Sequence, residues 1–197
     1  GIPGVTVQER ADDPGTAINI RGLQDFGRVA VVVDGTRQNF QRTGHNADGI
    51  FYLDPEMIGG VDVVRGPVAN IYGSGAIGGV VSYTTKDVDD ILRPSQRWGV
   101  LTHGELGSNK TQGFGSVFVA SRANPNFEFM AGAVDRSKTN YKDAERNEIQ
   151  NSGSRDWSGI VKATIRPAED HKVKLGYIHY DTSYITGQSN PPTLTAS

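Results

Sequence analysis

The sequence predicts two unlike parts, an α+β domain followed by a series of antiparallel strands of the membrane-barrel type. In the first part, β-branched runs such as Val29–Val33 alternate with glycine-rich turns, and Asp54 followed by Pro55 is a typical start of a short helix. From Trp98 onward the chain consists of segments of roughly ten residues in which apolar and polar side chains alternate. The composition agrees, because 25 of the 197 residues are glycine and none is cysteine.

The elements of the first part follow from its apolar runs and turn residues. The unbroken run Val29–Val33 predicts a strand buried on both faces, and Asp34 with Gly35 predicts a turn after it. Asp54 is the expected N-cap of the short helix. The core is expected to come from Val29–Val33 together with residues 61–64 and 80–81. Other strands are expected at residues 5–7, 18–20 and 80–85, loops at 22–27 and 40–49, and one helical turn at 69–72.

Alternation in the second part assigns each side chain to one face of a sheet. Within residues 157–166, for example, Trp157 and Val161 fall on one face and Lys162 falls on the other. A soluble β-sandwich also alternates and is the alternative architecture. The five segments are expected at residues 97–107, 113–121, 127–134, 157–166 and 172–180.

The links between these segments favour a barrel of the outer membrane. Tight links at 123–125 and 167–170 alternate with a long, charged link at about 137–155, as periplasmic turns alternate with outer loops. The link at 108–112 is short for an outer loop and supports this less. Five strands do not close a barrel, whose smallest members have about eight, so the chain is expected to be a piece of a longer protein.

Charge and motifs exclude several classes of function. The net charge of −2 gives no reason for a nucleic-acid partner. No signal peptide is expected at Gly1, and the longest aliphatic run, Val29–Val33, is far shorter than the ~20 residues of a membrane helix. The chain has no His-Glu-x-x-His, Gly-x-Ser-x-Gly or P-loop motif, so no enzyme is predicted.

One glycine motif suggests a rival function. Residues 73–78 fit G-x-G-x-x-G, which binds dinucleotides only where a strand feeds directly into the glycines and a helix opens from them. Here β-branched residues follow Gly78, and these favour a strand. A tight turn between strands is therefore favoured over a soluble nucleotide-binding enzyme, which stays as the alternative of another class.

Several motifs resemble, in order, the plug domain of TonB-dependent outer-membrane receptors. The stretch VDVVRGPVANIYGSGAIGGVVSYTTKD at 61–87 is similar to the end of that domain. Pro3-Gly-Val-Thr-Val7, Arg21-Gly-Leu and Val33-Asp-Gly-Thr-Arg37 are similar to its earlier signatures. The stretches RQNFQRTGHNADG and DPEMI look most like receptors for haem or haem-carrying proteins. The resemblance covers about residues 1–88 closely, and the rest only as a strand pattern.

The resemblance implies a plug domain at residues 1–88, a linker at 89–96 and the first strands of an incomplete transmembrane barrel at 97–197. The whole would be a plugged barrel of about 22 strands in the outer membrane of a Gram-negative bacterium. It would import haem, from haem itself or from a haemophore or haemoglobin, with energy from the TonB complex and with outer-membrane lipid around it. The TonB box would precede Gly1. A receptor for a siderophore or another metal chelate is the alternative within the family.

The resemblance also singles out a haem site. His45 stands in a loop between glycines, and imidazole is a usual ligand of haem iron. The rival interpretation is a solvent-exposed loop residue, and the second axial ligand would lie in the absent part of the barrel. Neighbouring aromatic and basic side chains are candidates for stacking on haem and for binding its propionates: Phe40, Phe51, Tyr52, Arg37 and Arg42.

The remaining histidines and charges receive structural interpretations. His103 is expected to face the barrel lumen, His171 to lie in a turn and His179 to belong to an aromatic belt at the membrane interface. Three linker carboxylates, Asp87, Asp89 and Asp90, are interpreted as solvated rather than as a Ca²⁺ site. Four charges beside apolar strands are expected to form ion pairs with each other or with the barrel wall: Arg21, Asp34, Arg65 and Lys86.

Overall fold

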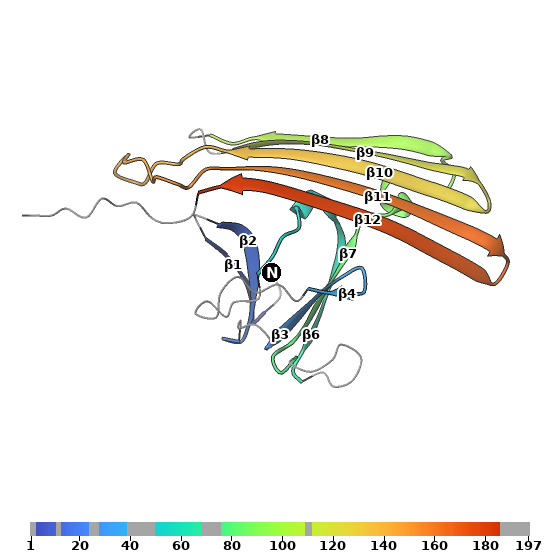
Figure 1. Ribbon diagram of the computed structural model, residues 1–197, viewed down its shortest axis with the longest axis horizontal. Helices are drawn as coiled ribbons and strands as arrows, with labels where there is room; N and C mark the ends of the chain where they lie inside the picture. The colour runs from blue at the N-terminus through green and yellow to red at the C-terminus, as the bar shows by residue number, and fades with distance from the viewer. Residues whose placement is uncertain are drawn as a thin grey trace, which may run out of the picture.

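The fold is taken from a computed structural model, and the structure describes residues 3–10, 13–23, 28–38, 50–67, 76–108 and 112–185. Five long strands form one curved sheet, which we call the wall sheet, and the plug domain lies against one face of it (Figure 1). This arrangement has the two unlike parts that the sequence predicts.

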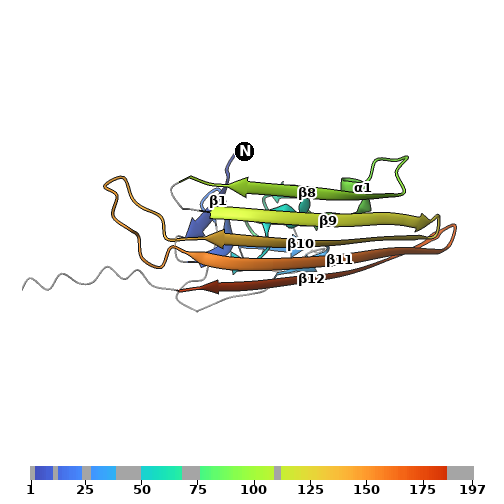
Figure 2. The same cartoon turned by 90° about the horizontal axis from the view of Figure 1, so that it is seen from above.

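The wall sheet is a plain antiparallel series in the order β12-β11-β10-β9-β8. Tight turns at 125–126 and 169–170 lie at one end, and the long link at 139–153 lies at the other. The short link at 107–111 joins β8 to β9 at the same end as the long link (Figure 2). Strands β9 to β12 run longer than the alternation alone predicts, whereas β8 is slightly shorter than its predicted segment 97–107. The strands are β8 Trp98–Leu106, β9 Gln112–Asn124, β10 Phe127–Lys138, β11 Ser154–Ala168 and β12 His171–Tyr184.

The two faces of the wall sheet are built as the alternation predicts. Trp157 and Val161 are exposed on the outer face, whereas Lys162 points inward and contacts the plug domain. Inward-facing Phe118 is fully buried because Gly132, on the neighbouring strand, leaves room for its ring. A Cβ at Gly132 would lie 2.1 Å from the nearest atom of that ring. Glycine at this position is therefore a packing requirement of the inner face.

The plug domain contains two small sheets. One has the order β4-β3-β7-β6, in which β3 is parallel to β7, and the other has the order β1-β2-β5. All five residues of β3 are buried, as predicted. The strands are β1 Val5–Arg10, β2 Asp13–Ile20, β3 Val29–Val33, β4 Thr36–Arg37, β5 Ile50–Phe51, β6 Ile58–Arg65 and β7 Gly79–Thr85.

The prediction that residues 61–64 belong to the core is wrong in part. Strand β6 lies at one edge of the four-stranded sheet and pairs with β7. Val61 and Val64 are exposed, and Val63 packs against the core. Val64 points to the opposite face from Val63, whereas Val61 shares the face of Val63 and is nevertheless exposed.

Two hydrophobic clusters organise the molecule. The first lies inside the plug domain and includes Ile20, Val31 and Val81. The second joins the plug side to the wall sheet, since Met57 and Val88 pack there with Met130 of β10. Apolar burial therefore holds the plug domain against the wall as well as holding it together.

Short helices form where the sequence places capping residues. The predicted helix after Asp54 is a single 3₁₀ turn, η1 Pro55–Met57, whose N-cap Asp54 accepts a hydrogen bond from the Glu56 amide at 2.8 Å. A second, unpredicted turn, α1 Val88–Ile91, begins with a capping box of Asp87 and Asp90. Among the residues that the structure describes, no helix is long and apolar enough to cross a membrane. The predictions for 40–49 and 69–72 concern segments outside the described residues.

Candidate functional site

The junction between the plug side and the wall sheet is lined by charges of opposite sign. Carboxylates on the plug domain and linker face Lys, Arg and His side chains on the wall, and within the described ranges five pairs bridge the two parts. The pairs are Asp34 with Lys162 at 3.2 Å, Asp54 with Arg136 at 3.0 Å, Glu56 with His103 at 3.1 Å, Asp89 with Arg122 at 2.5 Å, and Asp87 with Lys174.

The pair of Asp54 and Arg136 is the most buried, with 2% and 12% of the side chains exposed. Arg136 donates to both carboxylate oxygens, from Nε at 3.0 Å and from a terminal nitrogen at 3.1 Å. Its guanidinium also lies 4.2 Å from the ring centroid of Phe114. Because Asp54 caps η1 as well, one carboxylate fixes both the start of that turn and its position on β10.

Asp34 connects three segments at the predicted turn. Its φ of 46° is left-handed, which Asp tolerates better than most residues. The carboxylate accepts hydrogen bonds from the Thr85 amide at 2.9 Å and the Thr85 hydroxyl at 2.5 Å. Lys162, which contacts the same carboxylate, donates to the Thr85 carbonyl at 3.0 Å. The predicted ion pair between Asp34 and the barrel wall is thus confirmed.

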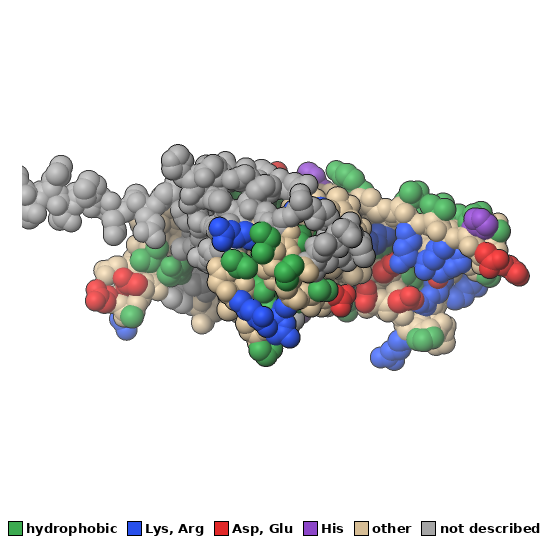
Figure 3. Space-filling model, turned by 90° about the horizontal axis from the view of Figure 1, so that it is seen from below, with side chains coloured by type: hydrophobic (Ala, Val, Ile, Leu, Met, Phe, Trp, Pro, Cys, Tyr) green, Lys and Arg blue, Asp and Glu red, His purple; other side chains and the backbone are tan. Residues whose placement is uncertain are grey.

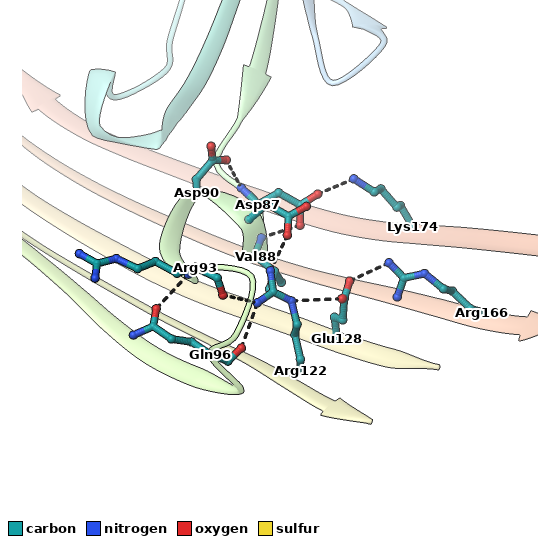
Figure 4. A network of polar contacts seen from close by, with 10 residues as sticks. Asp87, Val88, Asp90, Arg93, Gln96, Arg122, Glu128, Arg166 and Lys174 are labelled. Atoms are coloured by element: carbon teal, nitrogen blue, oxygen red, sulfur yellow. Dashed lines mark hydrogen bonds and ion pairs between the residues drawn. The ribbon is translucent and has the colours of Figure 1, made fainter. Parts of the chain in front are cut away.

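The linker is tied to the wall by a network of polar contacts around Arg122 (Figure 4). Arg122 donates to the carbonyls of Arg93 at 2.9 Å and Gln96 at 3.0 Å. It also lies 3.5 Å from Glu128, which accepts a hydrogen bond from Arg166 at 3.0 Å. The guanidinium therefore orders the chain between α1 and β8.

Asp87, at the end of the plug domain, forms a further contact with the wall, through Lys174 (Figure 4). Burial opposes ionisation, but hydrogen bonds from Lys174 and the Val88 amide, with the charges of Lys174 and Lys162, lower the pKa of Asp87 below its ordinary value. Asp90 accepts a hydrogen bond from the Asp87 amide at 2.7 Å.

Asp87 and Asp90 are consequently structural, whereas Asp89 is solvated as predicted, with 89% of its side chain exposed. Asp87 and Asp90 complete the capping box of α1, while Asp89 pairs with Arg122. In the described part of the chain, no group of three or more His, Cys, Asp or Glu side chains could hold a metal ion.

A cavity of about 620 Å³ lies between the plug domain and strands β11 and β12. Both charged pairs of this region line it, namely Asp34 with Lys162 and Asp87 with Lys174. Its other walls include apolar side chains and two tyrosines: Val33, Leu53, Ile178, Tyr52 and Tyr180. We call this space the plug–wall cavity.

Of His45, Arg42, Phe40 and Tyr52, the structure describes Tyr52. Its hydroxyl lies 3.2 Å from that of Tyr184, and its ring centroid lies 5.8 Å from that of Tyr180. Tyr184 ends β12 at the end of the sheet with the long link. His45, Arg42 and Phe40 lie outside the described residues.

The expectation that Phe51 could stack on haem is wrong. Its side chain is 5% exposed and its ring centroid lies 5.0 Å from that of Tyr83, inside the plug core. Phe51 pairs in β5 with Thr16 of β2, which directs its ring into this core. Arg37 is half-buried on β4.

The described histidines lie close to where the sequence predicts. His103 faces the plug domain, where its Nδ1 forms a hydrogen bond with the Glu56 carboxylate. Its ring meets the Phe114 ring edge-on, with the centroids 5.0 Å apart. His179 lies on the outer face with its ring centroid 5.3 Å from that of Trp157. His171 opens β12 directly after the turn at 169–170.

The other predicted charges bind carbonyl groups. Lys86 donates to the Glu56 carbonyl, and its ammonium lies 4.9 Å from the ring centroid of Phe118. Arg65 donates to the Pro3 carbonyl at 3.1 Å. Among the described residues, hydrogen bonds to the backbone take the place of their expected ion pairs. Arg21 has a φ of 51°, and its amide donates to the Gly4 carbonyl at 2.9 Å.

The context needed for a nucleotide loop is missing after the glycine motif. Gly78 leads directly into strand β7, and no helix opens there. Residues 68–75, which include the first three of the six motif residues, are outside the described part of the chain.

Sequence reasoning missed the partners of the inward-facing side chains. Alternation assigns Lys162 and Lys174 to one face, but it does not say which plug carboxylates lie opposite. It also missed Arg136, whose partner Asp54 is 82 residues away in the chain. The spacing of two from buried Val134 would have assigned Arg136 to the inner face.

Comparisons with known proteins agree on the class. Residues 1–80 match the family described as "TonB-dependent Receptor Plug Domain". The chain is 25% identical over 179 residues to TonB-dependent heme receptor A of Haemophilus influenzae, covering 90% of this chain and 24% of that protein. It is 45% identical over 98 residues to the hemin receptor of Yersinia enterocolitica, covering 50% of this chain and 14% of that protein.

A solved structure shares the fold of both parts. The hemophore receptor HasR of Serratia marcescens, solved as a double mutant in complex with its hemophore HasA and heme, superposes with a TM-score of 0.82. The two are 28% identical, and the match covers 92% of this chain and 28% of that chain. The matches to heme receptor A and to HasR cover most of this chain. They cover only about a quarter of the length of those two proteins.

Proposed function

We propose that this chain, which belongs to the TonB-dependent receptors and carries their plug domain, is part of an outer-membrane receptor that imports haem. The observation that carries the proposal is the similarity to the hemophore receptor HasR, at 28% identity over 92% of the chain. The cargo would come as haem or from a haem-carrying protein such as a haemophore or haemoglobin. The TonB complex would supply the energy, and the site would be the outer membrane of a Gram-negative bacterium.

The charged pairs support a plug domain that is held against the wall sheet but can separate from it. Its contacts with the wall, among the described residues, include five polar pairs and an apolar cluster around Met57 and Met130. Polar pairs can be exchanged for water as two surfaces separate, whereas the core around β3 stays within the plug domain. In this proposal, energy transfer separates the pairs and the plug domain moves as a unit of residues 1–88.

The proposed haem site is His45, with Arg42, Phe40 and Tyr52 around the ligand. Tyr52 supports it, because this residue lies beside Tyr184 at the end of the wall sheet that carries the long link. Long links face the exterior in outer-membrane barrels. His45 would supply one axial nitrogen to the iron, and another part of the full-length receptor would supply the second ligand.

Haem titration of the full-length receptor, followed by visible absorption, tests this function. His45→Ala should lose one axial ligand and change the spectrum, and His103→Ala is the matched control because its ring bonds Glu56 instead. Neutral imidazole is the ligating form, so haem affinity should fall as the pH drops below about 6.5.

An unaltered spectrum and affinity in His45→Ala would remove His45 as a ligand. If the parent receptor also failed to bind haem, the siderophore or metal-chelate alternative would replace the proposal.

A further inference from the structure

We infer that the plug–wall cavity is a transit site for the carboxylates of the cargo, with Lys162 and Lys174 as the groups that bind them. The inference rests on the proposed function, since it identifies the ligand as an apolar ring that carries carboxylates, as haem does. While the plug lies against the wall, Asp34 pairs with Lys162 and Asp87 pairs with Lys174. As the cargo passes, its carboxylates replace the two aspartates.

The cavity has the size and the direction that transit requires. Its volume of about 620 Å³ is typical of sites for small molecules. Four successive inward-facing residues of β12 line it: Lys174, Gly176, Ile178 and Tyr180. They span about 20 Å of strand. The cavity therefore extends along the wall, from the tyrosines near the long-link end towards the end with the tight turns.

The lining changes in character along this length. Tyr52 and Tyr180 lie at one end, where an aromatic ring can stack, and Ile178 with Leu53 adds apolar surface. Lys174 lies at the other end of the lining. Lys, Arg, Asp and Glu side chains gather on this face of the molecule towards the tight-turn end of the wall sheet (Figure 3). An apolar ring with carboxylates on one edge matches both halves of this lining.

The two lysines form a suitable pair of anion sites. Lys162 lies opposite Gly176 and Lys174 lies opposite Thr164 in the register of β11 and β12. They are thus diagonal neighbours, about 7–8 Å apart at the backbone. The Lys162 side chain extends over Gly176, where a Cβ would make an ordinary van der Waals contact with its Cγ at 3.6 Å.

Exchange of carboxylates explains how the plug could move without leaving the mostly buried Lys162 unpaired, whereas the Lys174 side chain is 54% exposed. Lys162 is 13% exposed, and a buried ammonium without a partner is strongly destabilising. Both present partners, Asp34 and Asp87, are carboxylates, the same chemical group as a propionate. A cargo that brings its own carboxylates keeps each lysine paired as the plug side withdraws.

The test separates transit from simple seating by changing one ion pair from each side. Lys174→Gln removes the cation, whereas Asp87→Asn keeps it and retains an oxygen that can cap α1. In cells that carry the full-length receptor, Lys174→Gln should lower haem uptake about tenfold, the value of one charge-assisted contact. Asp87→Asn should import haem at the parent rate or faster. Lys172→Gln, a charge on the same strand outside the cavity lining, is the control and should leave uptake unchanged.

A second cargo identifies the group that is recognised. Haem with both carboxylates methylated should enter the parent and the Lys174→Gln receptor at the same rate. If Lys174→Gln and Asp87→Asn raise or lower haem uptake by the same amount, the transit site is overturned. A residue pair that only holds the plug in place would show the same effect from either partner. Haem binding to the cell surface is measured in parallel. A parent that neither binds nor imports haem would refute the proposed function instead.

Discussion

Replacing Arg136 by Met should loosen the plug domain where it contacts β10. Asp54 is 2% exposed and receives both hydrogen bonds of the Arg136 guanidinium, so the substitution leaves a buried carboxylate without its cation. Loss of one partner from a buried pair costs about 3–5 kcal/mol. Met keeps apolar contact with Phe114, so the lost charge dominates the effect.

Hydrogen exchange measures this effect locally. The Met57 amide donates to the Asp54 carbonyl at 2.9 Å, so its protection reports the order of this segment. A loss of about 3 kcal/mol corresponds to exchange roughly a hundredfold faster. Adding Asp54→Asn should restore most of the protection, because Asn is neutral and still accepts a hydrogen bond from the Glu56 amide. Unchanged exchange at Met57, or no recovery in the double variant, would refute this reasoning.

Three further results are expected. Val32→Asp, at a side chain 1% exposed in β3, should cost about 3–5 kcal/mol and abolish protease resistance of the plug domain; parental resistance would contradict the buried strand. Gly132→Val should displace the Phe118 ring and lower the thermal stability of the receptor, and an unchanged melting temperature would contradict the packing. The lowered pKa of Asp87 means that its pair contributes stability above the ordinary carboxyl pKa of about 3.9 and loses it as the pH falls through the lower folded value. Protection of the Val88 amide should therefore persist at pH 5, and its loss there would contradict this.

Local patterns account for the elements that the sequence predicts correctly. The apolar run Val29–Val33 predicts a fully buried strand because only such a strand can hide both of its faces. Alternation around Trp157 predicts which side chains of β11 face outward and which face inward. A shift of the strand register by one residue would move every side chain to the other face. Asp54 and Pro55 predict the turn at η1 because capping acts within a few residues.

Contacts between distant segments account for what the sequence does not predict. The partner of Asp54 lies 82 residues away, and the partner of Asp87 lies 87 residues away. Phe51 is of a residue type that often contacts ligands, but its side chain packs into the core. The local sequence does not reveal this packing. The cargo is not fixed by the fold either, because function depends on the site that a fold carries.

Growth on haem tests the central claim most directly. The full-length receptor is supplied to TonB-containing cells that lack any other haem receptor, with haem as the sole iron source. We predict growth with the receptor, no growth without TonB, and strong impairment with His45→Ala. Growth on ferric siderophores but not on haem would contradict the account.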